Sequence, residues 1–242
     1  MIDLHSHILP GIDDGAKTMD DAIALIEQSI AADVTHIVCT PHIHQGVYDN
    51  DLSTILNAYD LLCYEVKSKA IPIKLAYSGE VRICPEIVSW VANKQLPFLG
   101  SWEGRSVLLL ELPHSHIPPG VENLIKWLLK SGIQPVIPHP ERNRDIIADY
   151  RKATSLKKQG CLFQVTAGAF TNRFNERVKD LAVKMLSDGL IDYIASDMHS
   201  IHRRPNDMKA ARVELDSLLS AEDVKRLTHT TPALITADLQ WR

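Results

Sequence analysis

The sequence has few cysteines, and none of them lies in a recognisable motif. The four are widely spaced and form no Cys-x-x-Cys pair: Cys39, Cys63, Cys84 and Cys161. This is the usage of a reducing compartment, so we expect reduced packing residues. A thiolate phosphatase also needs an arginine six positions after its cysteine to bind phosphate. The residues at that offset are instead Gln45, Lys69, Trp90 and Ala167. Cysteine-based phosphatase chemistry is therefore excluded.

Long apolar runs and an excess of basic residues are also lacking. The apolar segments are short, and the first residues lack the basic start and long apolar core of an export signal. The net charge of −4 provides no basic field for nucleic acid. Neither a Gly-x-Ser-x-Gly elbow nor a phosphate-binding P-loop motif is present. We expect a cytoplasmic protein with no membrane insertion and no nucleic-acid partner.

The first fifteen residues contain a group of side chains that commonly bind metals. His5 and His7 lie two positions apart in a short apolar run. In a strand, side chains at this spacing leave the same face, so both imidazoles suit one ion. Asp13 or Asp14, after a Pro-Gly turn, would bring a carboxylate to the same point. The alternative is an N-terminal strand with two incidental histidines, and the rest of the chain decides between these interpretations.

Strand-like and helix-like segments alternate along the whole chain. After the opening strand, further strands are predicted at residues 36–40, 73–82, 106–112, 133–137, 161–166 and 191–195. Helices are predicted from residue 18 and at residues 51–69, 86–93, 118–131, 149–159, 175–188 and 205–219. No linker or low-complexity segment interrupts this alternation. Residues 1–242 are therefore expected to form a single α/β domain with a parallel sheet and helices outside it.

The residues at the strand ends favour a closed barrel over an open sheet. In an open sheet, ligands draw on a few strands at a switch point, whereas in a barrel every strand end faces one mouth. Nine side chains of metal-binding type follow the predicted strands: His5, His7, Asp14, His42, Glu80, Glu111, His139, Asp197 and His199. Because they come from most of the strands, the sequence predicts a (β/α)7 barrel similar to a TIM barrel.

The composition of this set indicates metal-dependent phosphate chemistry. Buried carboxylates without cations would repel one another strongly. Imidazoles and carboxylates without thiolates favour Mn, Fe or catalytic Zn over structural Zn. Two or three ions, bridged by a carboxylate such as Glu80, would accommodate the set. A bridging hydroxide could then attack the phosphorus of a phosphate ester.

Two arginines are candidate catalytic residues that bind phosphate. Arg142 ends the motif His139-Pro-Glu-Arg, and Arg204 lies shortly after His199. A guanidinium group binds phosphate with paired hydrogen bonds. The alternative for each is a solvated arginine at a helix start. Arg82 is a weaker candidate, because it shares a face with Glu80 only if the strand extends that far.

Other polar and aromatic residues near these motifs have less certain roles. His114 and His116, in a loop bounded by prolines, and His44 are interpreted as polar residues of the entrance rather than as ligands. Phe170 and Phe174 either bracket an aryl leaving group or pack a loop. No side chain is assigned as the acid that protonates the leaving group.

Taken together, the motifs resemble those of the polymerase and histidinol phosphatase (PHP) superfamily. The resemblance rests on Asp3-Leu-His-Ser-His-Ile-Leu-Pro-Gly-Ile-Asp-Asp-Gly15, Thr40-Pro-His42, Gly79-Glu80, Glu111, His139-Pro-Glu-Arg142, Ser196-Asp197-Met-His199 and Arg204-Pro205. Over essentially its whole length, the sequence is most similar to the manganese-dependent protein-tyrosine phosphatases of bacterial capsule and exopolysaccharide systems.

This resemblance implies a distorted seven-stranded barrel of the PHP type with three manganese ions. One ion would be held by His5, His7, Glu80 and Asp197. A second would be held by Glu80, Glu111 and His139. The third would be held by Asp14, His42 and His199. The implied substrate is the tyrosine-rich tail of a cognate autophosphorylating kinase. Asn172 and Arg173 stand where smaller residues are expected, which bears on substrate preference rather than on hydrolysis.

Three alternatives to a phosphotyrosine-protein phosphatase remain at this stage. The nearest is a small-molecule phosphatase of the histidinol-phosphate type. A nuclease is disfavoured by the acidic net charge of −4. A regulatory module without activity could bind a kinase tail through its metals, but none of the expected ligands is missing.

Overall fold

Strands and helices alternate in the computed structural model, which describes residues 1–242. The strands are β1 (Ile2–Ser6), β2 (His36–Cys39), β3 (His42–Ile43), β4 (Lys74–Tyr77), β5 (Glu80–Arg82), β6 (Ser101–Trp102), β7 (Arg105–Glu111), β8 (Ile133–Pro138), β9 (Leu162–Thr166) and β10 (Tyr193–Ala195). The helices are α1 (Met19–Ala31), α2 (Leu52–Ser68), α3 (Ile87–Ala92), α4 (Val121–Lys130), α5 (Arg144–Ala148), α6 (Arg151–Lys158), α7 (Ala167–Phe170), α8 (Glu176–Ser187), α9 (Met208–Asp216), α10 (Ala221–Lys225) and α11 (Thr231–Ile235). Two single-turn elements, η1 (Pro140–Arg142) and the π-helical η2 (Arg226–Thr230), complete the set.

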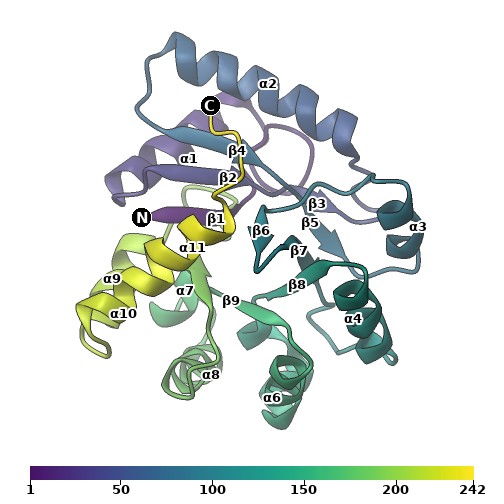
Figure 1. Ribbon diagram of the computed structural model, residues 1–242. Coiled ribbons are helices and arrows are strands. Elements are labelled where there is room, and N and C mark those ends of the chain that lie inside the picture. The colour runs from purple at the N-terminus through teal and green to yellow at the C-terminus, as the bar shows by residue number, and fades with distance from the viewer.

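The strands form two sheets, with the helices around their outside (Figure 1). The smaller sheet has the order β1-β2-β4, and the larger has the order β10-β9-β8-β7-β5-β3. All of these neighbours pair in parallel, and only β6 is antiparallel, in a hairpin with β7. The predicted α/β class with parallel strands is therefore confirmed. One continuous closed sheet, as a regular barrel requires, is not formed.

The sheets are separate because the chain breaks at two places, one inside the strand predicted over 73–82 and one after the strand predicted over 36–40, where the short strand β3 was not predicted. The segment predicted as one strand over residues 73–82 is split at Ser78 and Gly79. Gly79 packs so closely on Ile43 that a Cβ atom at position 79 would lie 2.7 Å from Cδ1 of Ile43. Pro41, which has no backbone N–H, similarly separates β2 from β3. Each interruption shifts the chain from the smaller sheet to the larger one.

Backbone hydrogen bonds still connect the two sheets at both junctions. At one junction, the amide of Asp197 donates to His5 over 2.8 Å, and the amide of His7 donates to Met198 over 2.9 Å. At the other, the amide of Glu80 donates to the carbonyl of Pro41 over 3.0 Å. The chain therefore brings β1 beside β10 and sets four predicted site residues, His5, His7, Glu80 and Asp197, at these junctions.

Apolar residues form a large cluster and a small one. The large cluster has 52 buried residues and includes the buried faces of the helices. The small cluster has 12 buried residues, and both sheets contribute to it: Leu4 comes from β1, Val38 from β2, Leu109 from β7 and Ala195 from β10. Inner faces of strands from the two sheets thus pack against each other. None of the helices combines the length and apolar character needed to cross a membrane.

The C-terminal segment packs against the small cluster. Ile235 is buried in it, and Trp241 packs on its edge. The chain end pairs with β4 through two hydrogen bonds of 2.8 Å between Leu75 and Arg242. Gly100 allows this packing, because a Cβ atom there would lie 2.0 Å from the carbonyl oxygen of Ile235.

The boundaries of several elements differ from those predicted. The helix predicted over 118–131 begins only at Val121, after Gly120 with its φ of 83°. The helix predicted over 149–159 is α6, and a separate short helix that was not predicted, α5, precedes it; the Asn143 side chain caps α5, and the chain becomes extended at Asp149. The sequence analysis also missed α7, β6 and the hairpin that β6 makes with β7. These are short elements, whose sequence patterns carry little information.

Candidate metal centre

The nine predicted ligands meet at one end of the strands. They come from β1 and the loop that follows it, from β3, β5 and β7, and from the residues just after β8 and β10. Eight of the nine are at least partly buried, and Asp14 alone is exposed. The grouping of these nine side chains is the geometry that the sequence analysis expects of a metal site. The nine side chains fall into three overlapping groups.

The first group contains His5, His7, Glu80 and Asp197. The Nε2 atoms of the two histidines are 3.1 Å apart. Each of these atoms lies 3.5 Å from Oε2 of Glu80 and 3.4–3.5 Å from Oδ1 of Asp197. Four potential donor atoms thus surround one point, and all four side chains are at most 1% exposed.

Hydrogen bonds behind the two histidines orient them toward that point. Nδ1 of His5 lies 2.8 Å from Oε1 of Gln164. Nδ1 of His7 lies 2.8 Å from Oδ2 of Asp13. When Nδ1 donates to such an oxygen, Nε2 is left as a lone-pair donor for a metal. Sequence reasoning considered either Asp13 or Asp14 as a ligand, and the structure gives them different places, with Asp13 behind His7.

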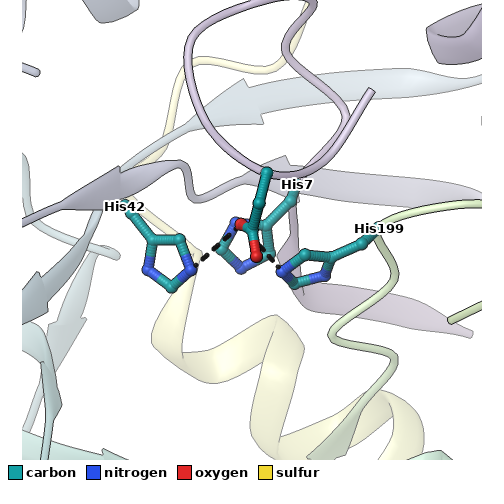
Figure 2. A group of neighbouring side chains, drawn as sticks. His7, His42 and His199 are labelled. Carbon is teal, nitrogen blue, oxygen red and sulfur yellow. Dashed lines mark ion pairs between the residues drawn. The ribbon is translucent and has the colours of Figure 1, made fainter. Parts of the chain in front are cut away.

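The second group lies around Asp14 on the more open side. Oδ1 of Asp14 is 3.3 Å from Nε2 of His42 and 3.4 Å from Nε2 of His199. Figure 2 shows His7, His42 and His199 with their rings gathered around this place, and the dashed lines mark the two ion pairs with the carboxylate. The rings of His7 and His199 are only 3.8 Å apart between centroids. Donor atoms of all four residues lie within 4.8 Å of one another.

The third group connects Glu80 with Glu111 and His139. Oε1 of Glu80 lies 2.9 Å from Nε2 of His139. Oε2 of Glu80 lies 2.9 Å from Nδ1 of His42, and Oε2 of Glu111 lies 3.8 Å from the same nitrogen. Glu80 therefore faces all three groups, as a bridging carboxylate would. His114 also belongs here, because its ring stacks on His139 with centroids 4.9 Å apart.

His114 and His116 differ in the structure, although the sequence analysis interpreted both as entrance residues. His114 is partly buried and lies beside Glu111 and His139, at the margin of the centre. His116 is exposed, and its Nδ1 atom lies 2.8 Å from the hydroxyl of Ser115. The two histidines differ because of the way their loop packs, and the sequence does not reveal that packing.

The backbone at this end of the strands is strained. His139 has a φ of 40° and Asp197 a φ of 52°, both in the left-handed region that side chains other than glycine rarely adopt. Gly15 returns the loop after β1 against His7, where a Cβ atom would lie 1.9 Å from the His7 carbonyl oxygen. This close approach lets Asp13 and Asp14 reach the histidines. Such strain is typical of functional sites.

The ionisable groups strongly perturb one another. Burial opposes a charge on Glu80, but His5 and His42 hold its pKa well below the ordinary value. Burial and the charge of Glu80 raise the pKa of Glu111 to about 7. Burial also opposes protonation of His5, yet Glu80 and Asp197 raise its pKa to about 9. Burial and Arg142 lower the pKa of His139 to about 3. Burial and mutual repulsion oppose full ionisation of the carboxylates unless further cations are present.

The donor set fits divalent metal ions. Three buried atoms of these side chains make no hydrogen bond: Nδ1 of His42, Oε2 of Glu80 and Oε2 of Glu111. The 2.9 Å separation of the first two lacks hydrogen-bonding geometry. A buried polar atom without a partner costs roughly 1–3 kcal/mol. Imidazole nitrogens and carboxylate oxygens are ligands for Mn, Fe and Zn, so an ion would satisfy these atoms.

Both candidate arginines contact the centre. A guanidinium nitrogen of Arg142 lies 2.6 Å from Oδ2 of Asp197, and one of Arg204 lies 2.5 Å from the same oxygen. Arg204 also lies 2.9 Å from Nε2 of His199. Their side chains are 14% and 27% exposed, so they lie between the buried carboxylates and solvent. Arg82 contacts Glu111 at 3.3 Å and the carbonyl of Leu112 instead.

The two phenylalanines of the α7 region have different environments. Phe170 is fully buried and packs in the large cluster. Phe174 is partly buried, and the guanidinium of Arg142 lies 4.7 Å from its ring centroid. Arg173 forms an ion pair with Asp207 and does not enter the centre.

All four cysteines are free and lie outside the centre. Burial raises the pKa of the Cys39 thiol well above its ordinary value, and it raises that of Cys161 to about 12. Such thiols are protonated near neutral pH, which agrees with the packing role expected from the sequence.

Comparison with known proteins places the chain among its relatives. The family described as "Capsular polysaccharide synthesis, CpsB/CapC" matches residues 1–236. The chain belongs to this family. CapC of Staphylococcus aureus is 36% identical over 228 residues, which cover 90% of this chain and 88% of CapC. YwqE of Bacillus subtilis, named as a tyrosine-protein phosphatase, is 32% identical over 235 residues, which cover 97% of this chain and 91% of YwqE.

Solved structures agree with this family assignment. A crystal structure from work on YwqE of Bacillus subtilis and CpsB of Streptococcus pneumoniae, described as metal-dependent tyrosine phosphatases, superimposes with a TM-score of 0.86. It is 31% identical, and the match covers 98% of this chain and 92% of that one. A β-aspartyl dipeptidase from Fervidobacterium islandicum, at 16% identity and a TM-score of 0.59, shares the fold alone, with 97% of this chain and 72% of that one covered.

Proposed function

We propose that this CpsB/CapC family member is a metal-dependent protein-tyrosine phosphatase. The observation that carries the proposal is the set of nine imidazole and carboxylate side chains, eight of them at least partly buried, at one end of the strands. The chain is also related throughout its length to named tyrosine-protein phosphatases. Residues 1–242 act as a single domain, in which the two sheets together serve as a distorted (β/α)7 barrel of the PHP type. The shared small cluster of inner side chains supports that arrangement.

The three groups of side chains would hold three ions. His5, His7, Glu80 and Asp197 would bind the first. Glu80, Glu111 and His139 would bind the second, and Asp14, His42 and His199 would bind the third. Mn is the ion proposed, with Fe or Zn as alternatives of the same ligand preference. Bound ions supply Lewis acidity to phosphate oxygens and lower the pKa of an attacking water.

The protein side chains have distinct tasks in this reaction. Arg142 and Arg204 lie at the exposed side of Asp197, where their guanidinium groups can turn to bind non-bridging phosphate oxygens. Asp13 and Gln164 hold His7 and His5 in the tautomer that leaves Nε2 free. Phe174, beside Arg142, provides an apolar surface for an aryl group. No cysteine takes part.

The substrate we propose is phosphotyrosine on a protein, specifically the tyrosine-rich tail of a bacterial tyrosine kinase that controls capsule or exopolysaccharide synthesis. The family description and the names of the relatives support this choice. The half-exposed Asp14 and the arginines open the centre to solvent, which suits a residue on a peptide. The reaction would take place in the cytoplasm, where such a kinase tail lies.

The direct test is hydrolysis by purified protein. We expect turnover of p-nitrophenyl phosphate that EDTA abolishes and Mn restores. A phosphotyrosine peptide should then be a better substrate than histidinol phosphate. Absence of Mn-restored turnover would contradict the enzyme assignment, and preference for histidinol phosphate would favour the small-molecule phosphatase.

A further inference from the structure

His114 lies where a ligand of the second ion would lie, although no sequence motif includes it. Its imidazole stacks on that of His139, with centroids 4.9 Å apart and planes inclined by 22°. One donor atom each of Glu111, His114 and His139 lies within 4.8 Å of the others. These three side chains, from the end of β7 and from the segments after β7 and β8, therefore face a common point.

The hydrogen-bonding state of His114 matches that of the ligands. Its Nε2 atom is buried and has no hydrogen-bond partner, and the same holds for Oε2 of Glu111 beside it. Among the other proposed ligands, Nδ1 of His42 and Oε2 of Glu80 share this property, which is also found outside the ligand set at Nε2 of Gln164 and Oε2 of Glu141. Native structures seldom retain such atoms unless a water or an ion satisfies them. The property that marks three ligands thus marks His114 as well.

The loop that carries His114 is tied to the segment that carries His139. The Nδ2 atom of Asn143 donates to the carbonyls of Pro113 at 2.8 Å and His116 at 3.2 Å. The amide of Arg144 donates to the carbonyl of His114 over 2.8 Å. Because these contacts fasten both loops together, the two imidazoles keep a fixed relative position. Rigid support of this kind is what a metal site requires.

We propose that His114 is a further ligand of the ion held by Glu80, Glu111 and His139, and that it binds through Nε2. This proposal rests on the proposed function, because it assumes that a divalent ion occupies this place. A second imidazole beside His139 favours ions that accept nitrogen, such as Mn, Fe or Zn, over Mg. His114 thereby sets both the affinity and the metal preference of this position.

The test compares His114 with its neighbour in the same loop. Metal-stripped wild-type protein, His114→Phe and His116→Phe are titrated with MnCl₂ by calorimetry. Phenylalanine keeps a flat ring against His139 but has no donor atom. We expect His114→Phe to weaken one class of Mn sites about tenfold or more, whereas His116→Phe binds Mn like the wild type because its side chain is exposed. A wild-type isotherm for His114→Phe would overturn the proposal.

Thermal unfolding separates ligation from a structural role. In EDTA, His114→Phe should unfold at the wild-type temperature or above it, because a buried atom without a partner is removed. Its Tm should then rise less than that of the wild type on addition of Mn. An equal rise would contradict ligation. If His114→Phe does not fold, His114→Gln provides the same comparison with a polar side chain of similar length.

Failure of this proposal differs visibly from failure of the proposed function. If His114 is not a ligand, both the wild type and His114→Phe bind Mn equally and the wild type still hydrolyses phosphotyrosine. If the protein is not a metal-dependent phosphatase, the wild type itself shows neither Mn binding nor Mn-restored turnover.

Discussion

Two regions along the inner faces of the strands are equally buried but differ in what they contain. In the small cluster, Leu4 and Leu109 are fully buried among other hydrocarbon side chains. Next to them, His5 in β1 and Glu80 in β5 are at most 1% exposed, yet they lie among charges. The first region stabilises the fold by removing apolar surface from water. The second keeps unpaired polar atoms and strained backbone, so it is arranged for binding at a cost in stability.

The largest effect is expected from Glu80→Gln in the polar region. Glu80 faces all three groups of ligands, so removal of its charge should lower kcat about a thousandfold or more, or roughly 4 kcal/mol. The isosteric side chain should leave the metal-free fold intact. Turnover with saturating Mn, and circular dichroism in EDTA, check both expectations. Near wild-type turnover would show that the polar region does not carry the reaction.

The matching change in the apolar region is Leu109→Ala. Deletion of this fully buried side chain should cost about 2–5 kcal/mol in the free energy of unfolding. Leu109 is the register partner of Glu80 in the β5–β7 ladder, but its side chain has no donor atom and packs in the small cluster, so kcat well below the Tm should stay close to that of the wild type. Urea denaturation in EDTA measures the loss of stability. A loss of Mn binding without a loss of stability would contradict the assignment of Leu109 to fold stability alone.

A smaller effect is expected from Asp13, which lies behind a ligand. Asp13→Ala removes the acceptor from Nδ1 of His7 and should weaken Mn binding about 10–100-fold. Asp13→Asn keeps an oxygen at this place and should restore much of the affinity. Asp20→Ala, an exposed residue of α1, is the control. Equal Mn affinity for Asp13→Ala and the control would mean that His7 needs no such support.

The dependence of Mn affinity on pH should be gradual. In the metal-free protein, the carboxylates around His5 raise its pKa to about 9 against the effect of burial, and burial raises that of Glu111 to about 7. Both groups therefore hold protons that must leave before they bind a cation. Mn affinity should rise from pH 6 to pH 8, with proton release detected by calorimetry in buffers of different ionisation heat. Binding without proton release would contradict these pKa shifts.

The sequence predicted well which side chains meet at one end of the strands, because their positions follow from local rules. His5 and His7 share a face by strand periodicity, and Glu111 and His139 follow apolar strands directly. The meeting of these residues at one end of the strands needed only the alternation of strands and helices. The same rules gave the parallel α/β class.

Features that depend on close contacts between distant segments could not be predicted. Asp13 and Asp14 are adjacent in sequence, and only the close approach of Gly15 to His7 gives them different partners. His114 and His116 likewise look alike until Asn143 fixes their loop. The split at Gly79, which prevents a continuous closed sheet, depends on packing against Ile43.

The most direct measurement is anomalous diffraction from crystals of the protein grown with Mn. The account predicts anomalous peaks between His5, His7, Glu80 and Asp197, beside Glu111 and His139, and beside Asp14, His42 and His199. Crystals that diffract well but show no manganese among these side chains would contradict it.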